Sequence, residues 1–250
     1  CNPSIGGLGK GHLVREIDAL DGIIAKAIDM SGIHFRMLNA SKGPAVRGLR
    51  AQADRNLYKK AINKLLKKEK NLKILEDEVV DLDINNKFVR GVVLSKNKIV
   101  SCETIVLTTG TFLNGLIHIG DKKIPAGRVG EKATYGLSKT FKKYGFNLGR
   151  MKTGTPPRIA KKSINFKKLK RQDSDKKITP FSFMNKSIKI KQIPCFITHT
   201  NQKTHKIIEK NIVKSAIYSG QIQSTGPRYC PSIEDKIVKF KDKNQHHIFL

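Results

Sequence analysis

Apolar residues recur with a helical period in two parts of the chain. Between His12 and Met30 they lie three or four positions apart, which predicts an amphipathic helix: Leu13, Ile17, Leu20, Ile24 and Ile28. A second helix is predicted from about Val46 to Lys68, where every fourth residue along one face is apolar: Leu49, Ala53, Leu57, Ala61 and Leu65. Gly43 and Pro44 mark the turn before it.

Short β-rich runs replace this pattern between about Leu72 and Phe112. Runs over 79–84, 88–94 and 99–109 are separated by polar turns, which predicts a small β-meander. The apolar stretch from Thr104 to Phe112 runs into a glycine turn, as a parallel strand does at the ligand-binding edge of an α/β sheet.

The stretch from Ala160 to Gln192 contains eleven Lys or Arg residues and two Asp residues, and its apolar positions keep no period. This pattern predicts an exposed, mobile insertion. A strand over 193–200 and a helix from about His205 to Ile217 are predicted after it.

Composition places the chain among globular proteins. Its 250 residues, 38% of them hydrophobic, suffice for one large domain or two modest ones. No stretch approaches the roughly 20 apolar residues that a membrane helix needs, and the first residues do not resemble a signal peptide. We therefore expect a cytoplasmic protein with no membrane partner.

The formal charge of +29, from 49 Lys and Arg against 20 Asp and Glu, has two explanations. One is a polyanionic partner, most simply nucleic acid. The other is a compositional bias toward Lys, Ile and Asn that raises the surface charge. Both remain open, because most of the basic residues are Lys in polar runs rather than Arg placed to read bases.

Glycines 6, 7, 9 and 11 form a dense turn ahead of the first predicted helix. Such a turn lets the backbone approach a phosphate or a flat cofactor, and the helix that follows offers free N–H groups. The turn is not a Walker loop, since Gly11 follows Lys10 and Ser4 stands where the first glycine is required. It is not a dinucleotide fingerprint either, because no strand precedes it. Alone, it reads as an ordinary tight turn.

Lys42, Arg47 and Arg50 cluster at the start of the second predicted helix and could hold an anionic group. A plain pairing of Arg50 with Asp54, one turn on, is the favoured interpretation.

Cys230 lies just ahead of a predicted helix start, where Ser232 and Asp235 make a capping-box pattern. The helix dipole and Arg228 would both favour its thiolate, so a nucleophilic role is favoured over a buried, inert thiol.

The other cysteines are far apart, which suggests neither disulfides nor a zinc ribbon. Cys195, His199 and His205 lack a fourth ligand at suitable spacing, so no metal site is expected. His246 and His247 are adjacent and are predicted to be surface residues on opposite sides of a strand.

Together these segments resemble the MnmG (GidA) family along nearly the whole chain. The matching blocks are 1–14, 39–46, 50–54, 107–112, 152–158, 198–201 and 226–240. Several long blocks in the same order are more specific than any single motif.

The resemblance implies an α/β fold, with a partial Rossmann-like FAD-binding domain and its β-meander over 1–150. An inserted α+β NADH-binding domain, with the Lys-rich segment 160–192, would occupy 151–250. The family's first strand and Gly-rich FAD fingerprint would lie before Cys1, and further parts after Leu250, so the chain would be an internal fragment. Asp21 departs from the glycine usual in the family.

The resemblance also implies a flavin-dependent enzyme that builds the carboxymethylaminomethyl group on the wobble uridine of certain tRNAs. It would use FAD, NADH and methylene-tetrahydrofolate, with the GTPase MnmE as partner and a homodimer as the assembled form. Cys230, and after it Cys1, match the cysteines proposed to act in the chemistry. The positions that would bind cofactors are Gly6, Gly7, Gly9, Val79, Thr134, Gly226, Pro227, Arg228, Tyr229, Ser232, Glu234 and Lys236.

Two alternatives stay open at this point. The folate- and FAD-dependent tRNA uridine methyltransferase shares the flavin fold and a cysteine mechanism, although the blocks 152–158 and 226–240 favour MnmG. A basic RNA-binding module or a decayed remnant without catalysis would also account for the charge. An isolated piece of this length is expected to bind FAD poorly and to lack activity.

Overall fold

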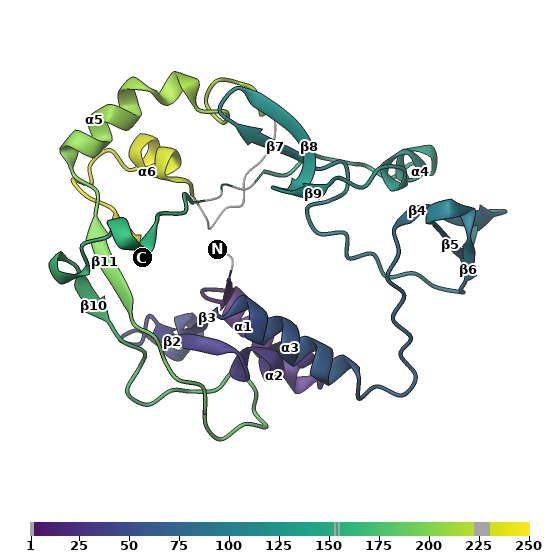
Figure 1. Cartoon of the computed structure of the whole chain (residues 1–250), viewed down its shortest axis with the longest axis horizontal. Coiled ribbons are helices and arrows are strands. Elements are labelled where there is room, and N and C mark those ends of the chain that lie inside the picture. Colours follow the sequence, from purple (N-terminus) through teal and green to yellow (C-terminus); the bar gives the residue numbers. More distant parts are fainter. Residues whose placement is uncertain (1–2, 153, 155, 223–230) are drawn as a thin grey trace. The chain divides into compact units, whose positions relative to one another are not determined.

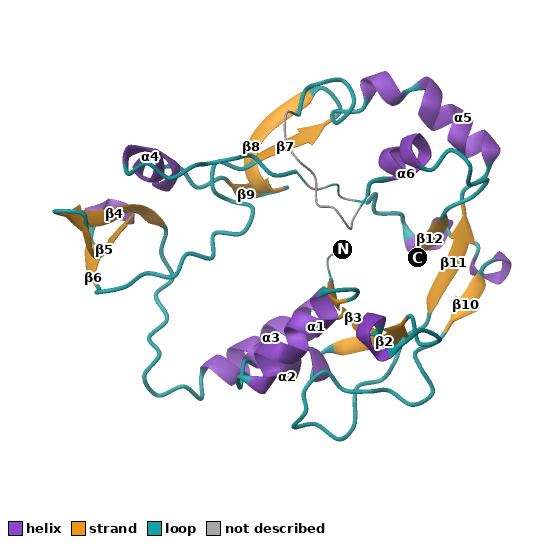
Figure 2. Cartoon of the chain, turned by 180° about the vertical axis from the view of Figure 1, so that it is seen from behind, coloured by secondary structure: helices purple, strands orange, loops and turns teal. Residues whose placement is uncertain are grey.

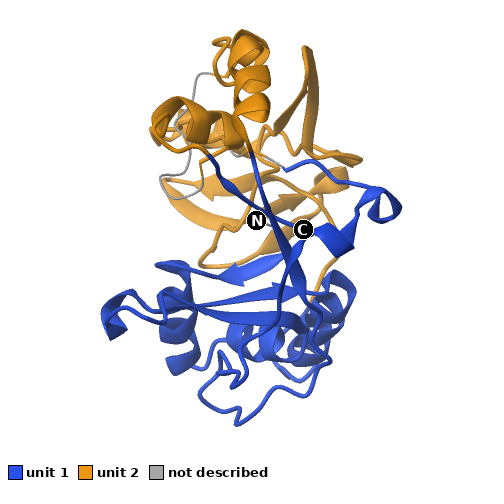
Figure 3. Cartoon of the chain, turned by 90° about the vertical axis from the view of Figure 1, so that its left-hand side faces the viewer, with its two compact units in different colours: residues 1–73, 155–200, 245–250 blue, residues 74–154, 201–244 orange. Residues whose placement is uncertain are grey.

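The computed structural model describes residues 3–152, 154, 156–222 and 231–250 (Figure 1). They form two compact units that are interleaved along the chain (Figure 3). Unit 1 comprises Cys1–Lys73, Thr155–Thr200 and Gln245–Leu250, and unit 2 comprises Ile74–Gly154 and Asn201–Asn244. The prediction divides the chain once, near residue 150, whereas the units exchange chain segments several times. The assignment of an FAD domain and an NADH domain stays a prediction.

Unit 1 is built on an antiparallel sheet in the order β1-β3-β2, with three helices. Its first elements are β1 (Ser4–Gly6), α1 (Lys10–Ala19), α2 (Ile23–Asp29), β2 (Gly32–Leu38), a 3-10 turn (Pro44–Val46), β3 (Gly48–Ala53) and α3 (Arg55–Leu66). Alternate residues of β3 enter the core, where Leu49, Ala51 and Ala53 pack with Phe35 and the distant Phe181. This period of two is the mark of a half-buried strand.

The first predicted helix is in fact two helices, separated at Leu20–Gly22. Asp21 has a φ of 66°, and the N–H of Gly22 donates to the carbonyl of Ile17 at 2.8 Å, which closes α1 with a left-handed cap. The left-handed residue is the one for which the resemblance expects glycine. Most of the predicted apolar face is exposed, with Leu20 85% accessible, while α1 buries Val14 and Asp18.

The prediction of the second helix, over 46–68, is wrong for about its first third. Residues 48–53 form β3, pairing with both β1 and β2, and α3 begins only after Asp54. The Asp54 carboxylate caps α3 by accepting from the N–H of Leu57 at 2.9 Å. Leu49 and Ala53, four positions apart, lie on the same face of a helix, but with Ala51 they also lie on the same face of a strand. Pairing with both β1 and β2 favours the strand.

The segment 160–192 is exposed along most of its length, but its middle is anchored. Phe181 and Ser182 are buried, and their N–H groups donate to the Asp29 carboxylate at 2.8 and 2.9 Å. The prediction of a mobile insertion is therefore wrong for this part, because a buried aromatic ring and bonded backbone amides hold it to the core. Short 3-10 turns at Lys161–Ser163 and Phe166–Lys168 and the strand β10 (Lys170–Gln172) precede the anchor.

A second sheet of unit 1 has the order β10-β11-β12. Strand β11 (Cys195–His199) confirms the predicted strand, and β12 (His247–Phe249) pairs with it. His246 is buried, contrary to the prediction of a surface residue, and its N–H donates to the Thr200 hydroxyl at 2.8 Å.

Unit 2 contains the predicted meander, three further short strands and three helices (Figure 2). Its elements are β4 (Val79–Asn85), β5 (Phe88–Leu94), a 3-10 turn (Ser95–Asn97), β6 (Ile99–Ser101), β7 (Leu116–Ile119), β8 (Lys122–Arg128), β9 (Glu131–Lys132), α4 (Leu137–Lys143), α5 (Gln202–Lys210), a 3-10 turn (Ile212–Lys214) and α6 (Ile233–Lys239). Strand β6 ends at Ser101, so the predicted continuation through Thr109 is wrong, and Val106 is 88% exposed. The Rossmann-like detail of the predicted fold stays a prediction. No helix in the described part of the chain is long and apolar enough to span a membrane.

Candidate functional site

The glycine turn between β1 and α1 divides its glycines between two roles. Gly6, Gly7 and Gly9 all have positive φ values of 82°, 99° and 70°, a region that favours glycine. A Cβ on Gly6 would collide with the Leu49 carbonyl and the Phe181 ring, so Gly6 allows close packing. A Cβ on Gly9 would meet nothing within 4 Å, and one on Gly7 would meet only the Leu38 side chain at 4.0 Å. Gly9 is exposed and presents open backbone, whereas Gly7 is buried and its N–H donates to the Leu49 carbonyl at 2.7 Å.

This open backbone leads into the N-terminus of α1. Gly9 is the N-cap, and no side chain in the described ranges caps the helix or places a carboxylate in its first turn. The first amide groups of a helix lack acceptors inside the helix and carry positive partial charge. Here the N–H groups of Lys10 and Gly11 already donate to the carbonyls of Leu8 and Gly7, at 2.8 and 2.7 Å, so the turn offers a cofactor mainly the exposed backbone at Gly9. FAD at this turn stays a prediction.

Basic side chains of β2 and β3 lie on the outer face of the same sheet. Arg36 and Arg50 are direct cross-strand partners. Arg50 does not pair with Asp54, as the helical interpretation expected; its guanidinium lies 5.5 Å from the Phe249 ring. Burial lowers the pKa of the neighbouring His34, and the charges of Arg50 and Arg36 lower it further, so His34 is neutral at pH 7.

His34 and Gln172 are site features that the sequence analysis missed. His34 is 1% exposed, its Nε2 lies 3.2 Å from the Gln172 carbonyl, and its Nδ1 has no hydrogen-bond partner among the described residues. The Gln172 Oε1 is likewise buried without one. Histidine on a strand with alternating burial is a weak signal, because such residues are common in ordinary cores.

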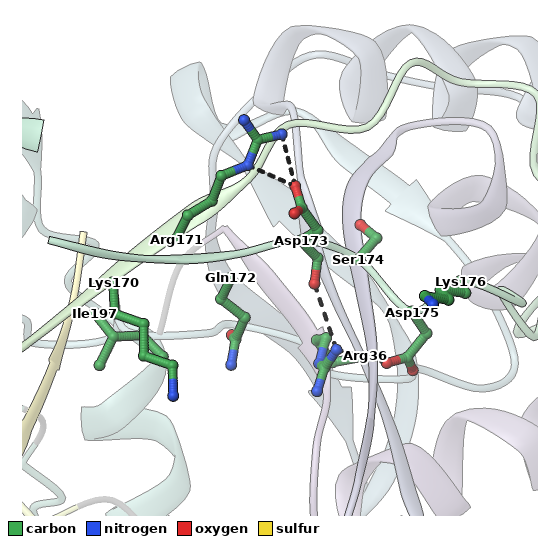
Figure 4. Close-up of a pocket in the computed structure, with 9 residues that line it drawn as sticks. All are labelled: Arg36, Lys170, Arg171, Gln172, Asp173, Ser174, Asp175, Lys176 and Ile197. Atoms are coloured by element: carbon green, nitrogen blue, oxygen red, sulfur yellow. Dashed lines mark hydrogen bonds and ion pairs between the residues drawn. The ribbon is translucent and has the colours of Figure 1, made fainter. Parts of the chain in front are cut away.

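A hollow of about 560 Å³ opens beside these residues in unit 1 (Figure 4). Arg36 ion-pairs with Asp175, and Arg171 with Asp173, each at 2.8 Å. The complete lining is Arg36, Lys170, Arg171, Gln172, Asp173, Ser174, Asp175, Lys176 and Ile197.

Val79 and Thr134, both predicted to contact FAD, lie close together in unit 2. Thr134 and Glu78, the residue before Val79, line one hollow of about 660 Å³. The turn after Thr134 packs on β4, because a Cβ on Gly136 would collide with the Val80 carbonyl. The hydroxyl of Ser95 and nearby N–H groups lower the pKa of Asp77 in this hollow. Its carboxylates suit ribose hydroxyls better than phosphates.

Ser232, Glu234 and Lys236 belong to the start of α6. The capping box is confirmed: the Ser232 hydroxyl accepts from the N–H of Asp235, and the Asp235 carboxylate accepts from the N–H of Ser232. Glu234 accepts from the Ser215 hydroxyl at 3.3 Å. The Tyr218 hydroxyl donates to Asp235 at 2.9 Å, and burial together with this bond raises the pKa of Tyr218 to about 12.

The remaining predicted site residues lie outside the described residues. They are Cys1, Gly226, Pro227, Arg228, Tyr229 and Cys230. Cys195, by contrast, is described, and burial raises the pKa of its thiol, with Arg50 partly opposing this shift. No group of three His, Cys, Asp or Glu residues in the described part could hold a metal ion.

The whole chain, residues 1–250, matches the family described as "Glucose inhibited division protein A". The chain belongs to this family. Among its relatives, the tRNA uridine 5-carboxymethylaminomethyl modification enzyme MnmG of Thermodesulfovibrio yellowstonii is 55% identical over 250 residues. The enzyme of the same name from Granulibacter bethesdensis is 52% identical over 253 residues. Each alignment covers 100% of this chain and 40% of the relative.

Solved structures of the same family agree with the fold. Aquifex aeolicus GidA in its form I crystal is 49% identical, with a TM-score of 0.90 and coverage of 100% of this chain and 43% of that one. Its form II crystal gives 47% identity and a TM-score of 0.87. The chain thus corresponds to less than half of a GidA protein, and the family resemblance noted from its motifs is confirmed.

Proposed function

We propose that this chain is part of a flavin-dependent enzyme that modifies the wobble uridine of tRNA at carbon five, as the name of its MnmG relatives describes. The full-length family match carries this proposal. The exposed, left-handed backbone at Gly9, the N-cap of α1, is consistent with a cofactor lying at this turn. We further propose a cytoplasmic enzyme that acts with MnmE and forms a homodimer.

The resemblance assigns FAD contacts to Gly6, Gly7 and Gly9 of the glycine turn and, separately, to Val79 and Thr134. Ser232, Glu234 and Lys236, with 226–229, would contribute to the NADH site. When bound, reduced flavin supplies hydride or carries the one-carbon unit derived from methylene-tetrahydrofolate.

Cys230 is proposed as the nucleophile, with Cys1 as the second cysteine in the chemistry. Carbon five of uridine is a poor nucleophile, and thiolate addition to the neighbouring ring carbon turns it into an enolate that can attack a methylene donor. The nearest described element is α6, whose helix start and capping box follow Cys230 by two residues in the chain.

Nucleoside analysis of tRNA from a strain lacking the gene tests the function. Loss of the wobble side chain supports it, whereas loss of ribothymidine would identify the uridine methyltransferase instead. A purified protein that is colourless yet binds tRNA would indicate a non-catalytic RNA-binding module. Full modification by the whole protein carrying Cys230→Ser would refute the role of Cys230.

A further inference from the structure

One face of the sheet β10-β11-β12 carries side chains that the proposed chemistry does not use. Residues paired directly across antiparallel strands point to the same face. The pairs Gln172↔Cys195, Lys170↔Ile197, Ile197↔Phe249 and His199↔His247 therefore define one face. We call it the aromatic face; its residues are Lys170, Gln172, Cys195, Ile197, His199, His247 and Phe249.

The two faces of this sheet differ in how the chain covers them. On the opposite face, the Phe196 ring packs on the Phe166 ring with centroids 4.7 Å apart. On the aromatic face, the His247 ring lies 4.7 Å from that of His199 and 6.2 Å from that of Phe249. Both histidines are exposed, and Phe249 is 46% exposed. Three neighbouring rings within unit 1 are thus open to a flat ligand.

Positive charge surrounds these rings. The Arg50 guanidinium lies 5.5 Å from the Phe249 ring, and Lys170 is exposed at the other end of the face. Neither forms an ion pair with a carboxylate in the described part of the chain. The two acidic residues nearby, Asp173 and Asp175, are already paired with arginines (Figure 4). A polyanion would therefore meet free cations here.

We propose that the aromatic face binds single-stranded RNA, with bases stacking on Phe249 and His247 and the phosphate backbone contacting Lys170. Rings alone would suit many apolar partners, and cations alone would suit any polyanion. The two together match single-stranded nucleic acid, which offers unstacked bases and a charged backbone at once. Duplex RNA keeps its base faces inside the helix and cannot use the rings. The inference rests on the proposed function in one respect: it takes the bound RNA to be the anticodon loop of the tRNA substrate.

The test measures binding of a fluorescent anticodon stem-loop RNA to the whole protein. Phe249→Leu keeps an apolar side chain but removes the ring, and should weaken binding roughly fivefold to a hundredfold, the worth of one stacked base. Phe249→Tyr keeps the ring and should bind as the unaltered protein does. Phe88→Ala is the control, since Phe88 is an exposed phenylalanine of β5, 69% accessible, outside this face.

The backbone contact is tested by salt dependence. Lys170→Gln should reduce the slope of log affinity against log salt by about one, the effect of one lost phosphate contact. Lys122→Gln, which removes an exposed lysine of β8, should leave the slope unchanged. A fully paired RNA of the same sequence should show no dependence on Phe249.

Equal stem-loop binding by Phe249→Leu and the unaltered protein overturns the inference, as does equal weakening by Phe249→Leu and Phe249→Tyr. If RNA binding depends on Phe249 but deletion of the gene leaves wobble uridine fully modified, the proposed function is overturned and the RNA-binding face stands. If deletion of the gene abolishes the modification but Phe249→Leu leaves RNA binding unchanged, the proposed function stands and the RNA-binding face is overturned.

Discussion

The buried carboxylate of Asp29 is the main attachment of the Lys-rich segment, and its removal should detach that segment. It accepts hydrogen bonds from the N–H groups of Phe181 and Ser182 and from the Asn185 amide, at 2.8, 2.9 and 2.9 Å. Asp29→Ala leaves two buried backbone N–H groups without acceptors. Each costs about 1–3 kcal/mol, so we expect unfolding of unit 1 to become easier by about 3–5 kcal/mol.

Two measurements check this expectation. Urea unfolding gives the loss in free energy, and limited trypsin digestion reports cleavage after Lys186 and Lys189, which should become fast. Asp242→Ala removes an exposed carboxylate and should change stability by no more than about 0.5 kcal/mol. A loss below about 1 kcal/mol for Asp29→Ala, with unchanged digestion, would refute the account of the anchor.

The same carboxylate should give a pH-dependent signature. Burial raises the pKa of Asp29, although its hydrogen bonds partly oppose the shift. A raised pKa means that the protonated form is favoured in the folded state. The contribution of Asp29 to the free energy of unfolding is therefore complete below the pKa that this group has in the unfolded chain. It is lost as pH rises through the pKa of Asp29 in the folded state. The stability of the unaltered protein relative to Asp29→Asn should fall as pH rises above about 4, the pKa of an ordinary Asp, and a constant or rising difference would contradict this.

Three further outcomes are expected. Asp21→Gly should raise the melting temperature by relieving the left-handed φ of 66°, worth about 1 kcal/mol, whereas Asp21→Ala should not. Ser232→Ala should cost about 1 kcal/mol by removing the cap of α6, and Ser232→Asn should restore it; a loss of NADH binding in both variants would mark a direct ligand contact. Gly9→Ala should reduce flavin content and cost about 1–2 kcal/mol for its left-handed φ of 70°, while Gly6→Ala should prevent folding, because a Cβ on Gly6 would also collide with the Leu49 carbonyl. Equal effects of the two glycine variants, measured by flavin absorbance and thermal unfolding, would remove the distinction between them.

Local patterns predicted the elements that local interactions decide. The capping box at Ser232, the meander over 79–101 and the strand over 195–199 needed only neighbouring residues, and all are confirmed. Strand β3 was mistaken for helix because its identity depends on pairing with β1 and β2, which no local period reveals. The burial of Phe181 depends in the same way on Asp29, more than a hundred positions away.

The candidate site follows the same division. The glycine turn and the capping box of α6 were predicted from residue types and spacing, whereas Glu234 and Lys236 were predicted from the family resemblance. The aromatic face could not be, because His199 and Phe249 become neighbours only through the ladder between β11 and β12. Arg50 joins them because β3 is a strand, and in the predicted helix it would have pointed to Asp54 instead.

The interleaving of the two units has a consequence for how this chain can be cut and how it is made. Unit 1 takes its strand β12 from residues that follow unit 2 in the chain. During translation, β11 is therefore made some fifty residues before β12, and one edge of β11 has no partner strand in that interval. A deletion from either end removes a segment of unit 1 and leaves its other segments without the part of the unit they pack against. Expression of one unit alone would need a splice that joins its separated segments, since each unit is made of segments that the other unit interrupts.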